Sequence, residues 1–222
     1  MGHALRKGIS FCDVSDRLLF LDLAADRYFC LGETAERAFR SLIERRELQL
    51  EESRALACLA VSGMLVETTD DQVPNAFRAG FAPSASLIET PASRVGIHHR
   101  LAAMVTLTRT RFSLRSGSLQ SVLHQLAEAK ANPRAVPETA PQPMHDVAAA
   151  FEWTARIVRS HDQCLSRSIA VARRLAALDL PADLMLGVRL RPFAAHCWVQ
   201  SGGWLVNDRL DTVRTYTPIL AV

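Results

Sequence analysis

Short apolar runs separated by polar turns dominate the first part of the chain, and this alternation predicts strands. The runs are rich in aromatic and aliphatic residues, and the turns between them contain Asp, a pattern typical of an antiparallel meander. Three such strands are expected at residues 10–14, 17–22 and 27–31.

The spacing of apolar residues becomes helical after residue 33. Thr34 can cap a first helix, whose apolar face would contain Ala38, Phe39 and Leu42. A second helix is expected from about residue 50 to residue 62, where Gly63 ends it. Three small strands followed by two or three helices predict a winged-helix-like α+β domain over residues 1–68.

Proline-rich segments interrupt the pattern twice in the remainder of the chain. Residues 69–93 contain three prolines and no sustained periodicity, which predicts a linker or a surface loop. A second proline-rich break covers residues 132–143. We therefore expect a second domain over residues 94–222, with helices at residues 96–110, 119–131 and 144–160.

The last part of the chain reads as one helix followed by three strands. Asp162 is a suitable N-cap for a helix that continues to about residue 178. Strands are expected at residues 184–190, 196–200 and 204–208. A helix that precedes an antiparallel sheet indicates an α+β domain rather than a parallel α/β fold.

Composition narrows the class of protein. Of the 222 residues, 49% are hydrophobic and 22% are charged, which is ordinary for a globular protein. No apolar run approaches the ~20 residues of a membrane span, and the first six residues lack the apolar core of a signal peptide. A formal net charge of +3 gives no argument for a nucleic-acid partner. These features predict a cytoplasmic protein without a membrane span.

The cysteines point to thiol chemistry rather than to disulfides or metal binding. There are five, an odd number, and none forms a CxxC pair; the seven histidines show no HExxH spacing. We therefore expect reduced thiols, no metal site and no cofactor. Cys12, Cys30 and Cys58 are interpreted as core or groove residues, and Cys197 as a packing residue.

Cys164 differs, because it follows the expected helix cap by two residues. The first turn of a helix has free N–H groups and a partial positive charge, and both favour a thiolate. The thiolate is the nucleophilic form of cysteine, and the same N–H groups can stabilise an oxyanion. Cys164 is therefore a candidate nucleophile.

His196 and Asp208 can supply the base and the group that orients it. A three-residue loop at residues 201–203 would pair Gln200 with Trp204 and place His196 opposite Asp208 on one face. In that arrangement Asp208 bonds Nδ1 of the imidazole and Nε2 faces the thiol. A two-residue loop would instead place Asp208 opposite Cys197, since a slip of one residue turns every side chain to the other face.

This second half resembles the lasso-peptide leader peptidases, often called B proteins, which have a transglutaminase-like, papain-like fold. The resemblance lies in Cys-Leu-Ser-Arg-Ser at residues 164–168, Ala-His-Cys-Trp-Val at residues 195–199, and a glycine turn before Asp208. It implies that Cys164 is the nucleophile, His196 the general base and acid, and Asp208 the orienting residue of a cysteine endopeptidase. The family commonly has Ala where this chain has Cys197.

The first half resembles the small leader-recognition domains of ribosomally made, modified peptides, such as the peptide chaperone of pyrroloquinoline quinone biosynthesis. The matching residues are Leu21-Asp22, the Tyr28-Phe29-Cys30-Leu31 run and the helix after Glu33. The resemblance implies that a leader peptide adds as a strand beside the third strand, with a groove at Tyr28, Phe29, Cys30 and Leu31.

Together the two resemblances imply a lasso-peptide maturation protease. It would bind the leader of a precursor peptide, hydrolyse the leader–core amide, and leave the core amine for a separate asparagine-synthetase-like cyclase. Two alternatives stay open at the level of sequence. The same three residues could transfer an acyl group to an amine, as a transglutaminase does, or Cys164 could be a core residue of a non-catalytic leader chaperone.

Overall fold

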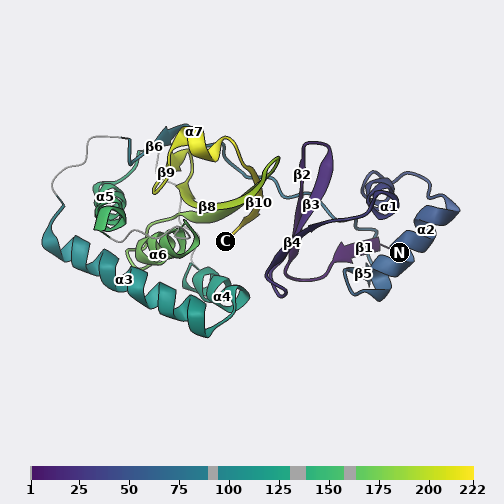
Figure 1. Ribbon diagram of the computed structural model, residues 1–222, viewed down its shortest axis with the longest axis horizontal. Helices are drawn as coiled ribbons and strands as arrows, with labels where there is room; N and C mark the ends of the chain where they lie inside the picture. The colour runs from purple at the N-terminus through teal and green to yellow at the C-terminus, as the bar shows by residue number, and fades with distance from the viewer. Residues whose placement is uncertain (1, 90–94, 131–138, 158–163) are drawn as a thin grey trace. The chain divides into compact units, whose positions relative to one another are not determined.

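The computed structural model describes residues 2–89, 95–130, 139–157 and 164–222. The chain forms two compact units, Met1–Arg78 and Ala79–Val222, each with its own strands and helices (Figure 1). The expected Asp162 cap and the end of the helix expected at residues 144–160 lie outside the described residues.

The first unit contains a three-stranded antiparallel sheet in the order β2-β3-β4, followed by two helices. The sheet strands are β2 (Ile9–Val14), β3 (Arg17–Asp22) and β4 (Arg27–Cys30), and the helices are α1 (Glu33–Ile43) and α2 (Leu50–Val61). These five elements match the sequence prediction. The outer strand β1 (Gly2–Leu5) pairs with β5 (Leu65–Thr68), a second small sheet that the apolar pattern did not reveal.

An aromatic cluster forms the core of this unit. The rings of Phe11, Phe20 and Phe39 are fully buried and lie 5.1 to 5.4 Å from one another. Phe11 and Phe20 are cross-strand partners in β2 and β3, whereas Phe39 comes from α1. The helix therefore packs its apolar face directly on one face of the sheet.

A buried carboxylate ties α1 to the sheet. Glu36 accepts hydrogen bonds from Nε of Arg17 at 2.7 Å and from the backbone N–H of Leu18 at 2.9 Å. Nη2 of Arg40 contributes a third bond at 3.2 Å. These bonds lower the pKa of Glu36, although its burial acts in the opposite direction.

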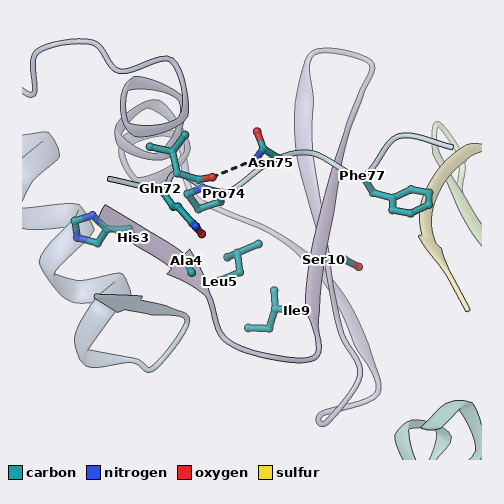
Figure 2. Close-up of a pocket in the computed structure, with 10 residues that line it drawn as sticks. His3, Ala4, Leu5, Ile9, Ser10, Gln72, Pro74, Asn75 and Phe77 are labelled. Atoms are coloured by element: carbon teal, nitrogen blue, oxygen red, sulfur yellow. Dashed lines mark hydrogen bonds between the residues drawn. The ribbon is translucent and has the colours of Figure 1, made fainter. Parts of the chain in front are cut away.

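The segment expected as a linker divides between the two units. The carbonyl of Gln72 accepts from the N–H of His3, and the N–H of Phe77 donates to the carbonyl of Phe11. Figure 2 shows this stretch beside β1 and the start of β2, where it lines a pocket of about 240 Å³. Residues 72–77 thus belong to the first unit.

The second unit is built on a five-stranded sheet in the order β10-β7-β8-β9-β6. Its strands are β6 (Ala85–Ser86), β7 (Asp183–Leu190), β8 (Phe193–Ser201), β9 (Trp204–Leu205) and β10 (Thr217–Ala221). Strand β6 comes from the second half of the expected linker and runs parallel to β9. Strands β6 and β10 were not expected.

Helices pack on this sheet in layers. The helices are α3 (Ile97–Ser116), α4 (Leu119–Ala129), α5 (Gln142–Ile157), α6 (Cys164–Ala176) and the short α7 (Leu210–Val213). Helix α6 lies between β8 and α3 (Figure 1). Ile169, Val171 and Leu175 of α6 are fully buried, because both sides of the helix are covered. Among the described residues, no helix is long and apolar enough to cross a membrane.

Candidate active site

Cys164 is the first residue of α6 and is half-buried. A hydrogen bond with His196 lowers the pKa of its thiol, although burial acts in the opposite direction. The backbone N–H groups of Leu165 and Cys197 also bond the sulfur and lower the pKa further. The position at the start of a helix, expected from the sequence, therefore favours a thiolate.

His196 and Asp208 lie against each other. Nε2 of His196 is 2.6 Å from Oδ2 of Asp208, and the second carboxylate oxygen accepts from the N–H of Arg209 at 2.8 Å. The two side chains are only 16% and 10% exposed. Burial opposes protonation of His196, but its bonds to Asp208 and Cys164 outweigh that effect and raise the pKa to about 9. This shift favours the protonated imidazole at neutral pH.

The hairpin register differs from the favoured prediction. Ser201 pairs with Trp204 and Gln200 with Leu205, so the turn contains two residues, Gly202 and Gly203. The physical reason is that a two-residue turn needs a left-handed first position, which Gly202 provides with a φ of 55°. The predicted pairing of Gln200 with Trp204 is wrong, yet the structure still brings His196 and Asp208 together.

The orientation of the imidazole also differs from the prediction. Asp208 bonds Nε2 rather than Nδ1, which leaves Nδ1 as the ring nitrogen for the sulfur of Cys164. The carboxylate reaches the ring from beyond the end of the short β9 rather than from the position directly across the ladder. In the predicted and in the observed orientation alike, one ring nitrogen faces Asp208 and the other faces Cys164. The imidazole therefore still links the carboxylate to the thiol.

Asp211, a second carboxylate three residues after Asp208, lies in the first turn of α7 and is exposed. Asp208 is the carboxylate that the structure places on the imidazole.

Two aromatic side chains, Trp198 and Tyr216, lie beside His196, and the sequence signals only the first of them. The ring of Tyr216 is 4.9 Å from the imidazole and that of Trp198 is 6.2 Å away. Trp198 is 1% exposed and fills the space above Gly187, which pairs with His196 across the ladder. Alternation along β8 places Trp198 on the face of His196, whereas no local pattern marks Tyr216, which follows α7 in an irregular segment.

The four residues expected to form a leader groove lie in or just after β4, which has a paired strand on one side only among the described strands. They divide between two environments. Leu31 is buried in the core and the ring of Phe29 stacks on Phe20 at 5.3 Å, so these two face inward. Tyr28 is half-buried and Cys30 is exposed.

Two of the other thiols, those of Cys12 and Cys197, are buried. Burial raises the pKa of Cys12 to about 12 and that of Cys197 even further, which keeps both protonated. Within the described ranges, no group of three or more His, Cys, Asp or Glu side chains could hold a metal ion.

Comparison with known proteins gives one family match and one similar relative. Residues 105–221, more than half of the chain, match the transglutaminase-like superfamily. A 45-residue stretch is 44% identical to the microcin J25-processing protein McjB of Escherichia coli, and it covers 20% of this chain and 22% of that relative. The chain thus matches about a fifth of the length of that curated relative. No solved structure shows significant similarity. The extent of the family match is decisive: this chain belongs to the transglutaminase-like superfamily.

Proposed function

We propose that the protein is a cysteine endopeptidase that matures a lasso-peptide precursor by cutting between leader and core. The observation that carries the proposal is the contact chain from Cys164 through His196 to Asp208, with a lowered thiol pKa at one end and a carboxylate 2.6 Å from the imidazole at the other. The similarity to a protein named for processing microcin J25 supports the choice of substrate class.

In this mechanism the resting site holds a thiolate beside an imidazolium, because the pKa of Cys164 is lowered and that of His196 is raised. The sulfur attacks the carbonyl carbon of the last leader residue. His196 then gives its proton to the departing core amine, which leaves a thioester on Cys164. His196 next takes a proton from water, and the resulting hydroxide releases the leader as a carboxylic acid. The core amine is then free for a separate asparagine-synthetase-like cyclase.

The first unit supplies recognition in this proposal. A leader strand would add to the side of β4 on which no described strand pairs, where backbone groups provide affinity and side-chain pockets provide register. Tyr28 and Cys30 flank the core-facing Phe29, so they are the residues placed to contact an added strand.

The test is the cleavage of a synthetic precursor, followed by mass spectrometry, with leader binding measured in parallel by fluorescence titration. Cys164→Ala should abolish cleavage and leave leader binding unchanged, since the thiol and β4 belong to different units. Cys58→Ala is the matched control, because Cys58 is an exposed thiol outside the second unit. Cleavage by Cys164→Ala at near the wild-type rate would exclude Cys164 as the nucleophile.

The family match keeps acyl transfer as a second candidate, because a thioester can be taken by an amine as well as by water. Product masses separate the two reactions. Hydrolysis gives two fragments whose summed mass exceeds the precursor by one water, whereas transfer from a glutamine side chain to an amine loses ammonia.

A further inference from the structure

Asn207, the residue before Asp208, is buried and joins three segments of the second unit. Its side-chain oxygen Oδ1 accepts from the backbone N–H of Val199 in β8 at 2.8 Å. Its Nδ2 donates to Oγ of Ser168 in α6 at 2.8 Å. The Ser168 hydroxyl in turn donates to the backbone carbonyl of Cys197 at 2.7 Å. All of these groups are buried, so each bond is protected from exchange with water.

The bond to Val199 ends the β8–β9 ladder. In the observed register Val199 would face Val206, and the N–H of Val206 does donate to the carbonyl of Val199 at 2.9 Å. The reciprocal bond is absent, because the N–H of Val199 is taken by the Asn207 side chain rather than by the carbonyl of Val206. The side chain thus replaces the main-chain partner and releases the following residues from the strand.

This release is what allows Asp208 to meet His196. Had the ladder continued in register, Asp208 would lie opposite Cys197 and would share its face of the sheet, one residue out of phase with His196. The carboxylate is instead 2.6 Å from the imidazole. The bond from Asn207 to Ser168 also anchors this stretch to the helix that begins with Cys164, four residues earlier in α6.

We propose that Asn207 is a positioning residue for the catalytic triad: it ends the ladder, directs Asp208 onto His196 and locks both to the helix of the nucleophile. The inference rests on the proposed function for its catalytic meaning. Asn207 does not act on substrate. Its effect passes through Asp208 to the protonation of the Cys164–His196 pair.

The test measures that pair without any peptide substrate. The rate of alkylation of Cys164 by iodoacetamide is followed from pH 5 to pH 9 by mass spectrometry of the modified peptide. Exposed Cys58 serves as the comparison thiol in the same molecule. Without the Asp208 contact His196 holds its proton less tightly, so less thiolate forms at low pH. We expect Asn207→Ala to move the Cys164 profile up by about one pH unit, a roughly tenfold slower reaction near pH 6.

Two further variants separate positioning from stability. Ser168→Ala removes the anchor on α6 and the hydroxyl's bond to the carbonyl of Cys197, but it leaves the bond from Val199 to Asn207 in place. It should therefore give a smaller shift in the same direction. Ser201→Ala is the matched control, since its buried hydroxyl bonds the carbonyl of Pro181 from the same strand β8. The control should lower thermal stability without moving the profile.

A folded Asn207→Ala protein with the wild-type profile would overturn the inference while the proposed function stood. If that variant does not fold, an unshifted profile in Ser168→Ala has the same consequence. Cys164 of the wild type reacting like Cys58 at every pH would overturn the proposed function, and the inference with it.

Discussion

Gly187 occupies a place in β7 that leaves no room for a side chain. It pairs with His196 across the ladder, and a Cβ built on it would lie 2.6 Å from two ring carbons of Trp198. The same Cβ would be 3.2 Å from the Cβ of Tyr216. Carbon atoms in contact normally stay about 3.5–4.0 Å apart, so Gly187→Ala requires the neighbouring aromatic residues to move.

The loss of stability in Gly187→Ala depends on how firmly Trp198 and Tyr216 are held in place. Trp198 is 1% exposed and its Nε1 bonds the side chain of Gln200, so the ring cannot swing into solvent. Extra carbon in a well-packed core typically costs about 1–3 kcal/mol of the free energy of unfolding. For a unit of this size we expect Tm to fall by roughly 2–12 °C. Because Trp198 and Tyr216 also flank His196, cleavage should weaken as well.

Tryptophan fluorescence during thermal unfolding is a suitable assay, because all three tryptophans, Trp153, Trp198 and Trp204, lie in the second unit. Gly80→Ala is the matched control, since a Cβ there meets nothing within 4 Å. Trp198→Phe removes the two crowded ring carbons. The double variant with Gly187→Ala should therefore lose less stability than the sum of the single losses.

Two results would refute this reasoning. One is a Gly187→Ala protein as stable as Gly80→Ala, which would mean that the sheet accommodates the added Cβ without losing free energy of unfolding. The other is strict additivity in the double variant, which would mean that the Trp198 ring is not the obstacle.

Three further outcomes are expected. Asp208→Asn should lower the cleavage rate by about 10³–10⁴-fold by analogy with other triads, whereas exposed Asp211→Asn should leave it unchanged; equal loss in both would contradict the contact at His196. Cleavage should follow a bell-shaped pH profile, rising as Cys164 becomes a thiolate and falling near pH 9 as His196 loses its proton. A profile that still rises above pH 10 would argue against the imidazolium. Glu36→Ala should destabilise the first unit by about 1–3 kcal/mol, because the buried N–H of Leu18 loses its acceptor; circular dichroism would measure this, and an unchanged transition would count against it.

The candidate site was predictable where its chemistry depends on local spacing. A cysteine at a helix start and a histidine in an apolar strand can be read from sequence, and the structure places both as expected. The register was not predictable in the same way, because two glycines allow a turn of two or three residues. The end of the ladder was not predictable either, because the Asn207 side chain bonds Ser168, which is far away in sequence.

Strands with weak local signals were also missed. β10 contains Pro218 and pairs with β7 only through a register shift. β1 begins with Gly2 and needs β5, some sixty residues later, to become a strand. Strand β6 has two residues and exists only beside β9. Each of these depends on a distant partner, which the periodicity of its own residues cannot reveal.

The pairing of β6 also determines where the polypeptide can be divided. The N–H groups of Ser84, Ala85 and Leu87 bond the carbonyls of Gly203 and Leu205, and the Ser86 hydroxyl bonds the carbonyl of Asp208 at 2.6 Å. A fragment that began at residue 94 would lose this strand and expose those carbonyls at the edge of the catalytic hairpin. A break between Arg78 and Ala79 keeps every one of these bonds. Two separately expressed halves cut there should each retain the strand pairings of its own unit.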